Sequence, residues 1–150
     1  MLDIVGGGPL HDELSRRIEG LGTSSWIRLV GKVSHDDLVD RYRRAWLVVS
    51  GSIAEGWGLS LTEGAACGTP AVATDISGHR CSVVDGRSGL LVAPGDLGET
   101  IADLVYDAAR LDRLRVGALD WASTLTWDAS ALGITAALHD AVVAAQRPDG

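Results

Sequence analysis

The sequence has no surplus of positively charged residues, and this argues against partners that carry many negative charges. The formal net charge is -7 over 150 residues, whereas binding a nucleic acid requires a basic face. No apolar run approaches the roughly 20 residues that a membrane-spanning helix needs. The two cysteines, Cys67 and Cys81, cannot form a disulfide framework, so we expect a reducing, cytoplasmic location. These shortages indicate an acidic globular protein that does not bind nucleic acid.

Short apolar runs rich in β-branched residues alternate with helical patterns along the chain. This alternation is typical of βαβ units, so we predict an α/β fold with a Rossmann-like parallel sheet flanked by helices. The length allows one domain with a sizeable core, and we predict a single domain over residues 1–150. Ser34 followed by Asp37 predicts a capping box at one helix start. The expected strands cover residues 2–5, 26–30, 46–50, 70–74 and 89–92. The expected helices cover residues 9–19, 34–44, 59–66, 80–84, 97–109, 111–123 and 129–146. Residues 147–150 are expected to form a loose tail.

The segment EGWGLSLTEGAACGTP, residues 55–70, carries the chemistry of this chain. Glu55 precedes an expected helix start, and Glu63 follows about two turns later, with seven residues between the two carboxylates. Gly56 and Gly58 let a ligand approach the backbone closely, and the N–H groups at a helix start attract phosphate. Ionised carboxylates accept paired hydrogen bonds from a vicinal diol. The segment therefore suits a nucleotide attached to a sugar.

The position of this segment in the expected sheet favours the same interpretation. Ligands of open parallel sheets bind beyond the carboxyl ends of the strands, and Glu55 lies in the loop after the third expected strand. On spacing alone, an alternative stays open in which Glu55 caps the helix and Glu63 is a solvated surface residue. GGGP at residues 6–9 does not fit a dinucleotide fingerprint, because His11 stands at the third glycine position. Arg80 is a further candidate for a phosphate contact.

Five more segments match one family in order and in register. They are IVGGGPL (4–10), RLVGKVSHDDL (28–38), CGTPAVATD (67–75), DGRSGLLVAPGD (85–96) and LTWDAS (125–130). Together with the two glutamates, they resemble the family 4 retaining glycosyltransferases of GT-B architecture. The resemblance implies a C-terminal, donor-binding domain of an enzyme that moves a sugar from a nucleotide diphosphate sugar to an acceptor hydroxyl with retained configuration. It implies no metal and no cofactor besides that donor.

The resemblance also implies roles for individual residues. Glu55 matches the glutamate that contacts the donor sugar and is expected to be the catalytic carboxylate, and Glu63 matches the glutamate that binds the ribose. The loop formed by Gly31, Lys32 and Val33 is expected to meet the nucleobase. Backbone groups of the turn between the glutamates are expected to hold phosphate, and this turn comprises Gly56, Trp57, Gly58, Leu59 and Ser60.

A GT-B enzyme has two Rossmann-like domains, and this chain resembles most of the second one only. The family's basic residues for the diphosphate precede the strand matched by residues 2–5, so we expect them and the acceptor domain to be absent. Without them the charge of the leaving group is poorly stabilised. We therefore expect the isolated chain to bind a nucleotide diphosphate sugar weakly and to transfer nothing.

The expected partners follow from that absence. One is the missing N-terminal acceptor domain, through which the enzyme would reach the inner membrane face. The alternative is a separate partner chain. An apolar stripe on the helix at residues 129–146, left uncovered, would favour a homodimer. Two other functions stay open: a catalytically silent nucleotide-sugar-binding module that needs a partner chain, and a GT-B sugar epimerase or phosphorylase-like enzyme.

Overall fold

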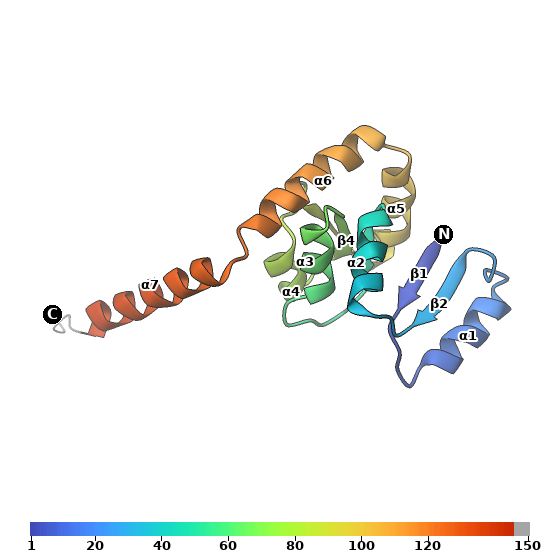
Figure 1. The fold of residues 1–150 in the computed structure, drawn as a ribbon, viewed down its shortest axis with the longest axis horizontal. Helices are drawn as coiled ribbons and strands as arrows, with labels where there is room; N and C mark the ends of the chain where they lie inside the picture. The colour runs from blue at the N-terminus through green and yellow to red at the C-terminus, as the bar shows by residue number, and fades with distance from the viewer. Residues whose placement is uncertain (146–150) are drawn as a thin grey trace. The chain divides into compact units, whose positions relative to one another are not determined.

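The computed structural model describes residues 1–145, so the expected helix end at Gln146 and the tail at residues 147–150 lie outside the described residues. By its contacts the chain divides into two compact units, residues 1–41 and residues 42–150. Each unit has its own parallel sheet (Figure 1). The single domain over residues 1–150 stays a prediction. The α/β class with parallel sheets flanked by helices is confirmed.

Strands and helices alternate along the first two thirds of the chain, as the sequence predicts, and helices follow. The strands are β1 (Leu2–Val5), β2 (Ile27–Gly31), β3 (Val48–Ser50), β4 (Ala71–Thr74) and β5 (Gly89–Val92). The helices are α1 (His11–Gly20), α2 (His35–Arg44), α3 (Leu59–Ala66), α4 (Ser77–Ser82), the 3-10 helix η1 (Pro94–Asp96), α5 (Leu97–Val105), α6 (Ala108–Ser123) and α7 (Trp127–Ala145).

The first unit pairs β1 with β2 in parallel, with α1 between them in the chain. No residue among 1–41 is buried, so apolar packing contributes little to this unit. Polar contacts link its elements instead: the Asp3 carboxylate on β1 accepts hydrogen bonds of 2.8 and 2.9 Å from Arg28 on β2, and one of 2.7 Å from Arg41 on α2. The predicted cap of α2 is confirmed, because the backbone N–H of Asp37 donates to Ser34 Oγ at 3.1 Å.

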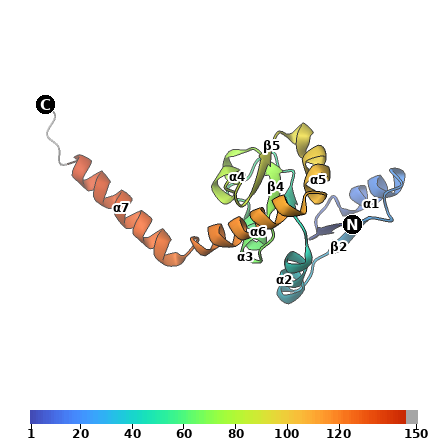
Figure 2. The same cartoon turned by 90° about the horizontal axis from the view of Figure 1, so that it is seen from above.

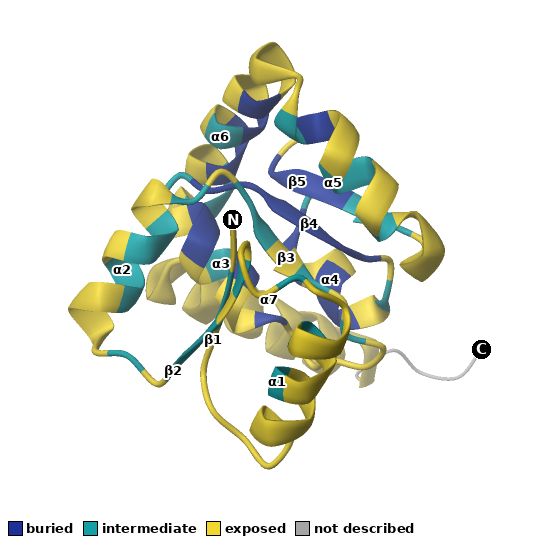
Figure 3. Cartoon of the chain, turned by 90° about the vertical axis from the view of Figure 1, so that its right-hand side faces the viewer, coloured by how far each residue is buried: buried dark blue, intermediate teal, exposed yellow. Residues whose placement is uncertain are grey.

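The second unit is built on β4, which lies between β3 and β5 with Val72 opposite both Val49 and Leu90. All four residues of β4 are buried (Figure 3). Because successive strand residues point to opposite faces, β4 contributes to two apolar clusters, and helices α3 to α6 surround it (Figures 1 and 2). One cluster contains Val72, Leu90, Leu104, Leu111 and Leu114, and the other contains Leu61, Ala71, Ala73 and Val83.

The observed boundaries match the sequence closely where the stop signals are local. α3 and β5 have the predicted bounds. The helix predicted over residues 97–109 ends earlier, at Val105. The Asp107 side chain accepts a hydrogen bond of 2.9 Å from the backbone N–H of Arg110 and so starts α6 three residues earlier than predicted. The third strand begins at Val48 rather than at residue 46.

Helix α7, red in Figure 1, carries the apolar residues that the sequence predicts. Trp127, Ile134, Leu138 and Val142 recur at helical spacing and are exposed by 55 to 88%. The pattern is less one-sided than predicted, because Leu132 lies off this stripe and is 72% exposed. None of the described residues of α7 is buried.

Within residues 1–145, no helix combines the length and the apolar character needed to cross a membrane.

Candidate functional site

The turn between β3 and α3 holds the first predicted site residue. Glu55 is exposed in this loop, beyond the carboxyl end of β3, and its Oε1 accepts a hydrogen bond of 3.0 Å from Ser52 Oγ. Gly58 immediately precedes α3 with φ 88°, a left-handed conformation that glycine adopts without a steric cost. The structure therefore contains the predicted order of carboxylate, glycine turn and helix.

The start of α3 is open to an anion. Within the described residues no side chain caps this helix start, so the alternative in which Glu55 caps α3 is wrong. The backbone N–H of Leu61 donates to the Gly58 carbonyl at 3.0 Å. The N–H groups before it, of Leu59 and Ser60, belong to exposed residues at the positive end of the helix dipole. This arrangement can bind a phosphate oxygen.

Helix α4 packs directly against the glycine turn. Gly58 is buried, and a Cβ placed there would lie 3.2 Å from both His79 Cδ2 and Ser82 Oγ. Trp57 is 37% exposed, so its ring is partly available at the surface beside this turn. The turn is therefore shaped by close packing against α4 as well as by glycine conformation.

Glu63 lies on the exposed side of α3, four residues after Leu59. This separation is about one helical turn, so Glu63 lies one turn into α3, and Glu55 lies four residues before the helix begins. Its Oε2 accepts a hydrogen bond of 3.0 Å from the Tyr42 hydroxyl. Burial first, and then the hydrogen bond and the charge of Glu63, raise the pKa of Tyr42 well above its usual value. Tyr42 therefore stays a neutral donor, and Glu63 keeps its other oxygen for a ligand.

The loop predicted to meet the nucleobase lies in the first unit. Gly31 ends β2 with φ 75°, and its carbonyl accepts a hydrogen bond of 2.8 Å from the N–H of Gly6. Lys32 passes Gly7 closely enough that a Cβ there would meet its stem at 3.7 Å. Gly31, Lys32 and Val33 thus lie at the carboxyl end of a parallel strand, as a base-binding loop requires. Their role stays a prediction.

Arg80 is engaged with a carboxylate in the same unit as Glu55. Its Nε and Nη2 donate hydrogen bonds of 2.6 and 2.8 Å to the two oxygens of Asp75. The hydrogen bond from Arg80 lowers the pKa of Asp75. This pair uses two of the five guanidinium donors, and the Asp75 charge offsets the positive charge that would attract a phosphate, which weakens that candidate.

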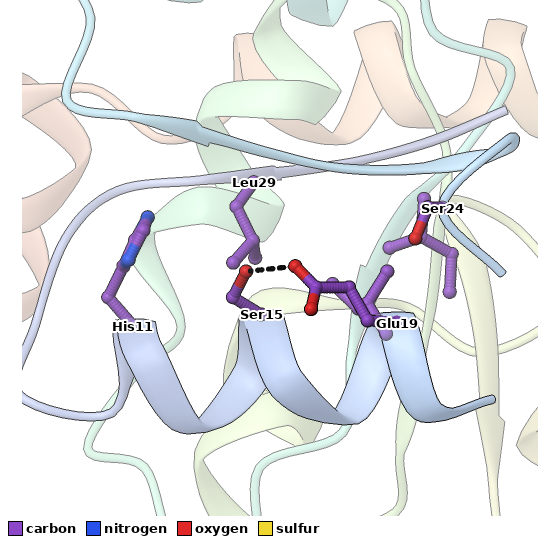
Figure 4. A pocket seen from close by; sticks show the side chains of 7 residues that line it. His11, Ser15, Glu19, Ser24 and Leu29 are labelled. Atoms are coloured by element: carbon purple, nitrogen blue, oxygen red, sulfur yellow. Dashed lines mark hydrogen bonds between the residues drawn. The ribbon is translucent and has the colours of Figure 1, made fainter. Parts of the chain in front are cut away.

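Neither Glu55 nor Glu63 is among the lining residues of two cavities in this chain. One of about 300 Å³ is formed by α1, β2 and the loop between them, and His11, Ser15 and Glu19 are among its lining residues (Figure 4). The other, of about 340 Å³, is lined by residues 85–110, including Asp85 and Arg110. Across residues 1–145, no group of three or more His, Cys, Asp or Glu side chains could hold a metal ion. Glu55 and Glu63 are both exposed, so the two carboxylates lie at the surface of this chain.

Parallel sheets covered by helices, with an acidic glycine turn after a strand, define an α/β domain of the GT-B type. The chain belongs to the family described as glycosyl transferases group 1, whose model matches residues 1–118. It is 38% identical over 134 residues to D-inositol 3-phosphate glycosyltransferase 1 of Catenulispora acidiphila, a match that covers 87% of this chain and 32% of that protein.

Solved structures show the same fold. Sucrose-phosphate synthase from Thermosynechococcus elongatus matches 95% of this chain and 39% of its own, with a TM-score of 0.79 and 26% identity. The Anabaena protein Alr3699/HepE, in complex with UDP-glucose, matches 81% of this chain and 35% of its own, with a TM-score of 0.73 and 27% identity. The resemblance to a glycosyltransferase domain is thereby confirmed, and the chain spans about a third of the length of the relatives it matches.

Proposed function

We propose that this chain is the donor-binding domain of a retaining glycosyltransferase that moves a sugar from a nucleotide diphosphate sugar to an acceptor hydroxyl. The observation that carries the proposal is the open start of α3, with one carboxylate before it and one within it. The UDP-glucose bound to Alr3699/HepE supports a uridine diphosphate sugar as the donor class.

Each part of the site has a role that fits its chemistry. The N–H groups of Leu59 and Ser60 bind the diphosphate and stabilise the charge that grows on it as the sugar leaves. Glu55 accepts hydrogen bonds from hydroxyls of the transferred sugar, and Glu63, held by Tyr42, accepts them from the ribose diol. Gly31, Lys32 and Val33 meet the nucleobase through their backbone.

The partners of this domain supply what its own site does not. An acceptor domain, or a partner chain with the same role, binds the molecule that carries the acceptor hydroxyl. Basic residues that in the family precede the strand matched by residues 2–5 balance the charge of the diphosphate. The isolated chain then binds the donor weakly and transfers no sugar. We place the protein in the cytoplasm, where nucleotide sugars are made, and infer that isolated chains pair through α7.

Calorimetric titration of the 150-residue chain with UDP and with UDP-glucose tests this function. Glu63→Ala should weaken the binding of both ligands by about 1–3 kcal/mol, because both contain the ribose. Glu55→Gln should weaken only UDP-glucose. Glu99→Ala, which removes an exposed carboxylate from α5, is the matched control and should leave both affinities unchanged. Wild-type chain that binds neither ligand, or equal effects of all three variants, would contradict the proposal.

A further inference from the structure

His79 on α4 is a fully buried histidine to which the site described above assigns no role. Its relative exposure is 0%, and both ring nitrogens have partners. Nδ1 lies 2.7 Å from the Thr74 carbonyl oxygen, and Nε2 lies 3.1 Å from Ser50 Oγ. A carbonyl oxygen can only accept, so Nδ1 carries a proton and the ring orientation is fixed.

The contacts of this ring continue to the carboxylate of the proposed sugar site. Ser50 Oγ lies 3.3 Å from Ser52 Oγ, and Ser52 Oγ donates to Glu55 Oε1 at 3.0 Å. The Thr74 hydroxyl donates to the Ser52 carbonyl and fixes the backbone of the same residue. An unbroken series of polar contacts thus joins His79 to Glu55 through two hydroxyls.

The hydrogens available to this series are limited. Its ends, the Thr74 carbonyl and the Glu55 carboxylate, accept only, so its four contacts need four hydrogens. A neutral imidazole and two hydroxyls supply three. With Nδ1–H directed at the Thr74 carbonyl, the Ser50 hydroxyl donates either to His79 Nε2 or to Ser52 Oγ, so the contact that Ser50 makes with Ser52 depends on the ring.

The backbone around Glu55 is held by the same helix. A Cβ added at Gly78, the neighbour of His79, would overlap the Glu55 carbonyl, so α4 lies directly against this residue. The ring of His79 lies under Gly58 on the other side of the turn. α4 therefore contacts both ends of the segment that runs from the sugar carboxylate to the helix start.

We propose that His79 is a positioning residue for Glu55, acting through the Ser50 and Ser52 hydroxyls to orient the carboxylate that accepts the donor sugar. The effect of this positioning on binding rests on the proposed function, because Glu55 contacts a ligand only if the site binds a nucleotide sugar. The link between the ring and the carboxylate is a property of the unliganded chain. The two can therefore be tested separately.

The first experiment needs no ligand. ¹⁵N resonances of the imidazole, assigned to His79 with the His79→Gln variant, are recorded for the full chain. Ser52→Ala and Glu55→Gln should each shift the Nε2 resonance, although at least one hydroxyl separates each residue from the ring in this series. Ser88→Ala removes another buried serine, one that contacts Val84 instead, and should leave the resonance unchanged. If the Nε2 resonance does not shift in Ser52→Ala or in Glu55→Gln, His79 is not linked to Glu55 and the proposal is overturned.

The second experiment measures binding of UDP-glucose and of UDP. Ser50→Ala and His79→Leu should each weaken UDP-glucose binding about fivefold and leave UDP binding unchanged, and their double variant should lose no more than either one. His79→Gln, whose amide can still reach Ser50, should recover part of the loss. If His79→Leu fails to fold, Ser50→Ala decides.

Three results separate the two proposals. Wild-type affinity for UDP-glucose in folded Ser50→Ala overturns the positioning role, and so does an equal loss in Ser88→Ala. If the wild-type chain binds neither ligand, the proposed function fails. The resonance shifts then decide alone whether His79 acts on Glu55.

Discussion

The Tyr42 hydroxyl donates a hydrogen bond of 3.0 Å to Glu63 Oε2, although the two residues are 21 positions apart in the chain. The bond joins the last turn of α2 to the exposed side of α3. It fixes one oxygen of a carboxylate that would otherwise move freely at the surface. Glu63 is thus an oriented acceptor before any ligand arrives, which lowers the entropy lost on binding.

Tyr42→Phe should change how stability depends on pH. The pKa of Tyr42 is raised in the folded chain, so above the ordinary tyrosine pKa of about 10 the unfolded chain loses a proton that the folded chain keeps. Stability is then lost as the pH rises through this range. Urea unfolding at pH 8 and at about pH 10.5 should show a larger loss for wild type than for Tyr42→Phe. Equal losses in the two proteins would contradict the assignment.

Gly58→Ala should destabilise the chain by about 1–3 kcal/mol, because it adds a Cβ to a left-handed residue and presses it against His79 and Ser82. Gly86→Ala is the matched control: Gly86 has φ 72° and nothing within 4 Å of an added Cβ. The difference between the two free energies of unfolding measures the packing under the turn. A larger loss for Gly86→Ala would mean that α4 does not support Gly58 as described.

Asp3→Ala should loosen the first unit, because this carboxylate is bound by Arg28 and Arg41 and residues 1–41 have little apolar core. The pairs are partly exposed, so we expect a loss of about 1–2 kcal/mol. Hydrogen exchange of the β1 and β2 amides should accelerate, and less so in Asp12→Ala, whose carboxylate is 97% exposed. Unchanged exchange in Asp3→Ala would show that strand pairing alone holds the unit.

The isolated chain should self-associate through α7, because Ile134 and Leu138 are each 63% exposed on one side of it. Sedimentation velocity should show a species that grows with concentration. Replacing both residues by serine should abolish it, whereas Thr135→Ser on the same helix should not. A wild-type chain that stays monomeric at all concentrations would contradict the dimer.

Local signals in the sequence predict most of the fold. The apolar run before Gly68 and Thr69 gives α3 its bounds, and Ser34 caps α2 as its spacing to Asp37 predicts. The sequence does not predict the end of α5, because a helical pattern continues across Asp107. The Asp107 side chain caps α6 only when it accepts the hydrogen bond from the N–H of Arg110. The sequence predicts helix boundaries poorly where two helices meet without glycine or proline between them.

For the same reason the sequence predicts the ligand-facing residues of the site but not the residues that orient them. Glu55, Glu63 and the glycine turn are close in sequence, so their spacing carries a signal. Tyr42 and His79 reach the same carboxylates from other elements, and nothing in the local pattern of either residue indicates it. Their contacts depend on how β3, β4 and the helices pack, which single-sequence periodicity does not contain.

Gly64 follows Glu63 directly, and a Cβ there would lie only 2.5 Å from Val48 Cγ2 on β3. The missing methyl group sets how deep α3 settles onto the sheet. A larger residue at this position would force α3 or the Val48 side chain to shift. The close approach of α3 to β3, and with it the position of Glu63 relative to the loop after β3, therefore depends on the absence of a side chain at residue 64.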